Sequence, residues 1–153
     1  MRPADLVTIH EIQQLKHRYL RTLDGKDWAG FREVFCADAT AAYGDRLTFT
    51  GVDEIVAFMA DNLGPTMITM HQVHQPEIAV DGTEATGTWS LQDRVIMTEH
   101  RLLLEGCSIY HDRYRLEGGT WRIAHTSYLR QFEHVVSMDD LPSFRLTANR
   151  FAP

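Results

Sequence analysis

The stretch TMITMHQVHQPEIAVDGTEATGTWSLQDRVIMT, residues 66–98, decides the fold because it holds two long β-rich segments joined by a turn. The Asp81-Gly82 pair between them is typical of a two-residue hairpin, since Asp and Gly tolerate the positive φ that such a turn requires. Two more segments of the same kind follow, separated by Gly118-Gly119. The sequence therefore predicts a meander of four long antiparallel strands, at residues 66–80, 84–98, 101–116 and 120–135.

The part of the chain before this stretch has helical periodicity. Apolar side chains recur there at steps of three and four, as one face of an amphipathic helix requires, at Leu6, Ile9, Ile12, Leu15, Tyr19 and Leu23. We expect Gly25 to end this helix as a residue free to take positive φ. Two shorter helices and two short strands are predicted next, the helices at residues 27–35 and 51–63 and the strands at residues 39–43 and 47–50.

Helices followed by a meander of long strands predict an α+β fold in one domain, residues 1–153. Strands of this length must curl, so we expect a cone-shaped, curved antiparallel sheet. This half-barrel would have N-terminal helices that close a central pocket with an apolar interior, a natural place for a small molecule. Residues 137–153 have neither period and are expected to form an irregular C-terminal tail.

The composition excludes several classes of partner. The net charge of −6 argues against nucleic acid and anionic membranes, which are bound through a basic face. No run of about 18 apolar residues is present, and the N-terminus lacks the apolar segment of a signal peptide. The two cysteines, Cys36 and Cys107, have neither metal-binding nor disulfide-framework spacing. We therefore expect a cytoplasmic protein that binds neither nucleic acid nor membrane.

His71 and His74 are the first candidates for chemistry. Residues i and i+3 of a strand point to opposite faces, so the two imidazoles cannot line one pocket unless a bulge intervenes. A shared metal site is therefore disfavoured, and we expect no bound metal. One of the two histidines is a candidate for function, and the alternative for either is a structural role.

Asp24 is the candidate partner for one of these histidines. It falls at the end of the first helix, where the helix dipole disfavours a carboxylate that has no donor or cationic partner. A carboxylate that accepts from one imidazole nitrogen fixes the tautomer and stabilises the imidazolium, so that the histidine can act as a base. The alternative is that Asp24 only begins a turn, as Asp before Gly often does.

The string RYLRTLDGKDWAGFREVFCADA at residues 18–39 and the MHQVHQPEI segment at residues 70–78 resemble the SnoaL-like branch of the NTF2-like superfamily. The resemblance covers residues 9–130 and implies the cone-shaped fold. Within the superfamily the chain is similar to scytalone dehydratase, bile acid 7α-dehydratase and hexachlorocyclohexane dehydrochlorinase. Those enzymes carry an aspartate at the end of the first helix and a histidine at the start of the first long strand. Asp24 and His71 occupy these positions.

The resemblance implies a cofactor-independent lyase of dehydratase type, or an isomerase, that acts on a small, mostly apolar cyclic substrate. His71 would remove a proton from carbon, Asp24 would hold the imidazole, and Tyr19 would donate to the oxygen that gains charge or departs. No cofactor is expected. The family alignment turns further side chains inward as substrate-binding residues, namely Tyr43, Phe58, Trp89, Tyr110, Tyr128 and Arg130.

Some features leave the function open. Thr126 and Tyr128 occupy the positions at which some relatives carry a basic residue on the last strand, and Arg130 lies further along the same face. Asp93 and Arg130 would each need a partner on an inward face. The fold hosts many chemistries. One alternative is a non-catalytic ligand-binding module, whose cone would stay filled with apolar side chains. Another is a polyketide cyclase or hydrolase, in which the carboxylate activates water or serves as the acid.

The outward faces of the last two long strands predict self-association. They would leave Ile109, Ile123 or Leu129 exposed unless covered, and exposed apolar patches usually mark an interface. We expect a homo-oligomer, with a trimer suggested by the related dehydratases and a dimer as the alternative.

Overall fold

The structure, a computed structural model, describes residues 3–153. Six strands form one sheet with the order β2-β1-β6-β5-β4-β3. The elements follow along the chain as α1 (Pro3–Asp24), α2 (Trp28–Glu33), β1 (Phe35–Tyr43), β2 (Leu47–Thr50), α3 (Val52–Asn62), β3 (Met67–Asp81), β4 (Glu84–Met97), β5 (Leu102–Glu117), β6 (Thr120–Ser137) and the 3-10 turn η1 (Met138–Asp140).

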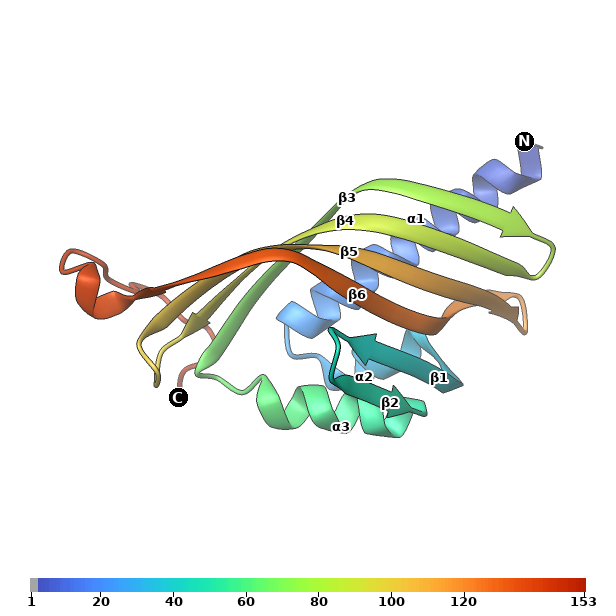
Figure 1. The fold of residues 1–153 in the computed structure, drawn as a ribbon. Helices are drawn as coiled ribbons and strands as arrows, with labels where there is room; N and C mark the ends of the chain where they lie inside the picture. The colour runs from blue at the N-terminus through green and yellow to red at the C-terminus, as the bar shows by residue number, and fades with distance from the viewer. Residues whose placement is uncertain (1–2) are drawn as a thin grey trace.

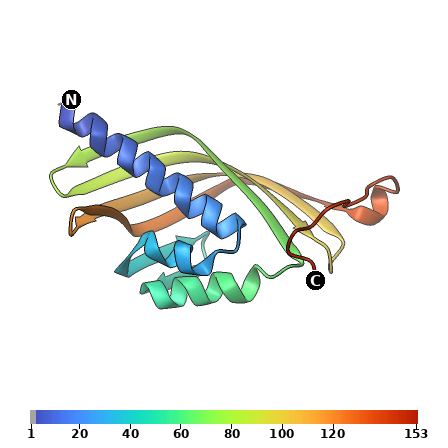
Figure 2. The same cartoon turned by 180° about the vertical axis from the view of Figure 1, so that it is seen from behind.

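The sheet is curved and open, and the helices lie on its concave side (Figure 1 and Figure 2). The four long strands arch over α1, while α2 and α3 lie below them next to β1 and β2. The predicted α+β half-barrel with N-terminal helices is therefore confirmed. Neighbouring strands run antiparallel, and β1 alone pairs with its neighbour β6 in parallel. Parallel pairing is possible there because β2, α3 and three long strands separate β1 from β6 along the chain.

Helix α1 forms because apolar side chains recur on one of its faces. Ile12, Leu15, Tyr19 and Leu23 are buried, whereas Leu6 near the start of the helix is 56% exposed. Burial of a large apolar side chain contributes about 1.5–3 kcal/mol. The second half of the helix is therefore held against the concave face of the sheet, and its last residue is placed there with it.

The end of α1 differs from the prediction in one residue. Lys26, not Gly25, takes positive φ, at 56°. The backbone N–H of Asp27 donates to the carbonyl of Thr22 at 2.9 Å, and that of Lys26 donates to the carbonyl of Leu23 at 3.1 Å. These two bonds form a Schellman motif, which places the left-handed residue two positions after the last helical residue.

Bulges decide which way some strand residues face. The register of β5 with β6 shifts between Arg113 and Tyr114, and Ile123 lies fully in the core. The outward position predicted for Ile123 is therefore wrong, because strict alternation fails across a bulge. Leu129 does face outward and is 54% exposed.

The C-terminal tail contacts the loop before β3, which lies at the same end of the sheet as the end of β6. After η1, residues 141–153 contain neither helix nor strand, and they turn back toward the start of β3 (Figure 2). The side-chain amide of Asn149 donates to the carbonyl of Pro65 at 3.0 Å, and the ring of Phe151 lies 5.0 Å from Nζ of Lys26. Within residues 3–153, no helix has both the length and the apolar character needed to cross a membrane.

Candidate active site

A cavity of about 240 Å³ lies between the helices and the concave face of the sheet. Its apolar lining consists of Leu23, Leu47, Phe58, Met59, Leu63, Met67, Val95, Met97 and Leu104. Its polar or aromatic lining consists of Tyr19, Tyr43, Thr69, His71, Asp93, Tyr110, Tyr128 and Arg130. A mostly apolar cavity with a few convergent polar groups is the usual character of a small-molecule site.

His71 and Asp24 form a hydrogen-bonded pair at the wall of this cavity. Nδ1 of His71 lies 2.6 Å from Oδ1 of Asp24, and the two side chains are 14% and 23% exposed. The same carboxylate accepts the backbone N–H of His71 and the hydroxyl of Thr69, each at 2.8 Å. These donors compensate the position of the carboxylate at the negative end of α1. Because Nδ1 is engaged, Nε2 is the nitrogen of His71 that is left for a ligand.

Lys26 holds the start of β3 next to this pair. Its Nζ donates to the carbonyl of Met67 at 2.8 Å. Burial lowers the pKa of Lys26, and the charge of Asp24 opposes this shift. The end of α1 is thereby joined to the strand that carries His71. His74, on the other face of that strand, is exposed and does not line the cavity.

Tyrosines form one wall of the cavity. The hydroxyls of Tyr19 and Tyr43 lie 3.1 Å apart. The ring of Tyr110 stands edge-on to the rings of Tyr19 and Tyr128, with centroids 6.1 and 5.8 Å apart. Burial raises the pKa of Tyr19, Tyr43 and Tyr110 well above the usual value. Their hydroxyls therefore stay protonated near neutral pH and can donate to an oxygen of a ligand.

Arg130 and Asp93 form a second charged pair on the cavity wall. The contact is bidentate, with Nη1 at 2.5 Å from Oδ1 and Nη2 at 3.0 Å from Oδ2. Asp93 is only 5% exposed and lies directly opposite His71 in the pairing of β3 with β4. The partner that an inward Asp93 requires is thus Arg130.

Trp89 does not line the cavity, in contrast to its predicted role. It is 1% exposed, and its Nε1 donates to the hydroxyl of Tyr114 at 2.9 Å. That hydroxyl donates to Asp112 at 2.8 Å, and Asp112 also pairs with Nζ of the buried Lys16 at 2.8 Å. Nζ of Lys16 lies 3.4 Å from the ring centroid of Tyr110. Trp89 therefore belongs to a sealed polar network that joins α1 to the sheet behind the tyrosine wall.

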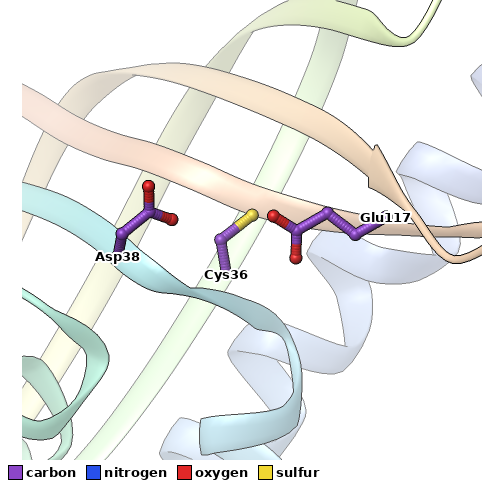
Figure 3. Close-up of side chains that lie close together, drawn as sticks. All are labelled: Cys36, Asp38 and Glu117. Atoms are coloured by element: carbon purple, nitrogen blue, oxygen red, sulfur yellow. The ribbon is translucent and has the colours of Figure 1, made fainter.

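Cys36, Asp38 and Glu117 bring a thiol and two carboxylates together away from the cavity (Figure 3), with ligand atoms within 4.8 Å of one another. Arg115 already pairs with both carboxylates, at 2.5 Å to Asp38 and 2.6 Å to Glu117. Burial raises the pKa of the Cys36 thiol to about 11. The cluster is thus an ion-pair network, beside a larger groove of about 490 Å³ that Asp38 and Arg115 also line.

Residues 4–127 match the model of the SnoaL-like domain. The chain belongs to the SnoaL-like family. The resemblance expected from the sequence is therefore confirmed, and the match includes the end of α1 and the four long strands as far as the middle of β6.

Solved structures show the same SnoaL-like, NTF2-like fold. A type 2 hexachlorocyclohexane dehydrochlorinase has 14% identity and a TM-score of 0.82, with 95% of this chain and 97% of that chain covered. A scytalone dehydratase-like protein from Novosphingobium aromaticivorans has 18% identity and a TM-score of 0.82, with coverage of 97% and 95%. An NTF2-like protein of unknown function from Pseudomonas putida KT2440 has 20% identity and a TM-score of 0.66, with coverage of 83% and 89%.

Sequence reasoning missed three polar residues, of which Thr69 and Lys26 lie next to the pair and Lys16 lies in the sealed network. Thr69 had a clear signal, because it lies two residues before His71 and therefore shares its strand face. Lys16 lies three positions before Tyr19 on the apolar face of the helix, which is a weaker signal for a buried charge. Lys26 had no local signal, because its partner Met67 is 41 residues away.

Proposed function

We propose that this SnoaL-like protein is a cofactor-independent lyase of dehydratase type, or an isomerase, in which His71 is the general base. The observation that supports this most is the contact of 2.6 Å between Nδ1 of His71 and Oδ1 of Asp24 at the cavity wall. A histidine whose Nδ1 donates to a carboxylate presents an unprotonated Nε2 and gains a stabilised imidazolium when it takes a proton. A catalytic base of this kind contributes about 10²–10⁴-fold to a rate.

The proposed reaction is a dehydration. Nε2 of His71 takes a proton from a carbon beside a carbonyl, and the electrons of the C–H bond go into the enolate. Of the hydroxyls of Tyr19 and Tyr43, the one that accepts in their mutual hydrogen bond donates to the enolate oxygen as it gains charge. The enolate collapses to a C=C bond as the C–O bond of the neighbouring carbon breaks, and the departing hydroxide takes the proton back from the imidazolium to leave as water. In an isomerisation the same proton returns to a different carbon.

The cavity supports a small, mostly apolar ring compound as substrate. Its volume of about 240 Å³ lies below the range of about 300–1,000 Å³ that is typical of sites for drug-sized ligands. Phe58 and the other apolar side chains of the lining would contact the ring, and Tyr110 and Tyr128 would orient its oxygen substituents. The hexachlorocyclohexane dehydrochlorinase and the scytalone dehydratase-like protein share this fold, which is consistent with elimination chemistry.

Two alternatives are less well supported by the geometry. A non-catalytic module would keep its cone filled, whereas this cone contains a cavity with a hydrogen-bonded acid–base pair at its wall. A cyclase or hydrolase of the kind considered above would use the carboxylate on water. Asp24 stands behind His71 and does not line the cavity, which favours the lyase.

The experiment that tests the proposal is a substrate screen read by mass spectrometry. Cyclic hydroxy-ketones, sterol-like compounds and aromatic polyketide intermediates are incubated with the wild-type protein and with His71→Ala. We expect loss of water, or a change of retention at constant mass, from at least one compound with the wild type only. Conversion by both proteins at equal rates would contradict the proposal.

We also propose that the protein is a homotrimer or homodimer, supported by the exposed apolar residues of β6. Leu129 and Phe132 are 54% and 60% exposed on the same strand, and exposed apolar patches often mark an interface. Light scattering at micromolar concentration should give a multiple of 17.6 kDa, and Phe132→Glu should lower it. Leu146→Glu, on the tail and 40% exposed, is the matched control. A wild-type mass near 17.6 kDa would contradict self-association.

A further inference from the structure

The guanidinium of Arg130 packs directly against Gly106 of the sheet. A Cβ on Gly106 would lie 2.7 Å from both Cζ and Nη1 of Arg130, so only glycine leaves room for the guanidinium at that position. Nη1 donates to Asp93 and to the buried Ser108, Nη2 donates to Asp93, and Nε donates to Glu133. A guanidinium has five N–H groups, so one N–H on Nη2 is left.

The charges of the cavity lining balance. Among the lining residues that the structure describes, Arg130 is the only lysine or arginine and Asp93 is the only carboxylate. Their bidentate contact uses the edge of the guanidinium that a ligand carboxylate would otherwise occupy. A ligand carboxylate would have to approach Asp93 or displace it, and a like charge at close range is a strong element of discrimination.

We infer that Asp93 is a specificity-determining residue, which makes the cavity select uncharged ring compounds over carboxylates by cancelling the charge of Arg130. The inference rests on the proposed function in one respect, because it takes this cavity as the substrate site. The ion pair therefore keeps Arg130 in the cavity wall without an anion-binding site.

Binding of two matched fluorescent probes tests this inference without any turnover. The probes are 2-naphthol, which is uncharged near neutral pH, and 2-naphthoate, which has the same ring system and a carboxylate. We expect the wild type to bind 2-naphthol at least about tenfold more tightly than 2-naphthoate, which corresponds to about 1.4 kcal/mol. Wild-type binding of 2-naphthoate at equal or greater strength, or of neither probe, would overturn the inference.

Variants locate the effect on Asp93. Asp93→Asn keeps the shape and an acceptor for Arg130 but leaves only the half-exposed Glu133 to offset the guanidinium charge, so the affinity for 2-naphthoate should rise at least about tenfold. The double variant Asp93→Asn, Arg130→Gln should lose this gain. Glu133→Gln is the matched control, because Glu133 also pairs with Arg130 but is half-exposed and does not line the cavity. It should change the ratio of the two affinities by less than about threefold.

The result remains separable from the proposed function. If Asp93→Asn fails to fold, the wild-type ratio of affinities still decides the inference. Selection of 2-naphthol with no conversion in the substrate screen would leave the specificity intact and remove the lyase. Conversion in the screen with no selection between the probes would support the lyase and remove the specificity.

Discussion

Two acid–base pairs join α1 to the sheet, and their surroundings are opposite. Lys16 and Asp112 are both fully buried, with 2.8 Å between Nζ and Oδ2. Asp24 and His71 are 2.6 Å apart but partly exposed at the cavity wall. In the first pair every charged group faces protein. In the second, Nε2 of His71 is left for a ligand. We propose that similar chemistry on one helix serves stability where it is sealed and catalysis where it is open.

The largest expected effect comes from breaking the open pair. His71→Ala or Asp24→Ala should lower turnover of a substrate found in the screen by about 10²–10⁴-fold, with thermal unfolding little changed. The double variant should cost little more than either single one, because the two residues act as a unit. His74→Ala, on the opposite and exposed face of β3, is the control and should keep full activity. Additive losses in the double variant would argue against a pair.

Breaking the sealed pair of Lys16 and Asp112 should lower the stability of the fold. Lys16→Met leaves the carboxylate of Asp112 without its cation, and loss of one partner of a buried pair costs about 3–5 kcal/mol. For a domain of this size the unfolding midpoint should fall by about 10 °C. Adding Asp112→Asn removes the unpaired charge while keeping an acceptor for one of Tyr114 and Thr126, so part of the loss should be recovered in urea unfolding. A Lys16→Met protein of wild-type stability would contradict the distinction between the two pairs.

The buried tyrosines should set the alkaline limit of the fold. Burial raises the pKa of several tyrosines well above the usual value, namely Tyr19, Tyr43, Tyr110 and Tyr114. The unfolded chain ionises near pH 10 while the folded protein keeps these protons, so stability should fall as the pH rises above about 10.

Burial lowers the pKa of Lys16, which acts in the opposite direction, because the folded protein releases that proton first. Lys16→Met should therefore make the fall steeper, and Tyr43→Phe should make it shallower. Urea unfolding between about pH 8 and pH 11 measures both slopes. Equal slopes in Tyr43→Phe and the wild type would show that Tyr43 titrates normally in the folded protein.

The smallest expected effect concerns Trp89. Trp89→Phe removes the hydrogen bond to the hydroxyl of Tyr114, which should cost about 1 kcal/mol of stability. The values of kcat and KM should stay within about threefold of the wild type, because Trp89 does not line the cavity. A change of KM beyond about tenfold, or 1.4 kcal/mol, would indicate that Trp89 contributes to substrate binding after all.

Local patterns predicted the elements, whereas long-range contacts decided the details of the site. Alternation predicted the long strands, although the first two-residue turn is Gly82-Thr83, one position later than expected. Strand parity assigned His71 and His74 to different faces. The inward turn of Ile123 could not be predicted, because it depends on a bulge that arises from pairing with a strand elsewhere in the chain. The position of Trp89 outside the cavity could not be predicted either, because it depends on a hydrogen-bond and ion-pair network that spans α1 and the sheet.

The tautomer of His71 tests the central claim most directly, because it needs no substrate. Two-dimensional ¹H–¹⁵N correlation across the imidazole rings, near neutral pH, distinguishes protonated from unprotonated ring nitrogens, and His71→Ala assigns the signals. We predict that neutral His71 carries its proton on Nδ1, in the hydrogen bond to Asp24, and that Nε2 is unprotonated. Asp24→Asn should abolish this preference. A neutral His71 with its proton on Nε2 would contradict the account, because that nitrogen could not accept a proton from a substrate in the cavity.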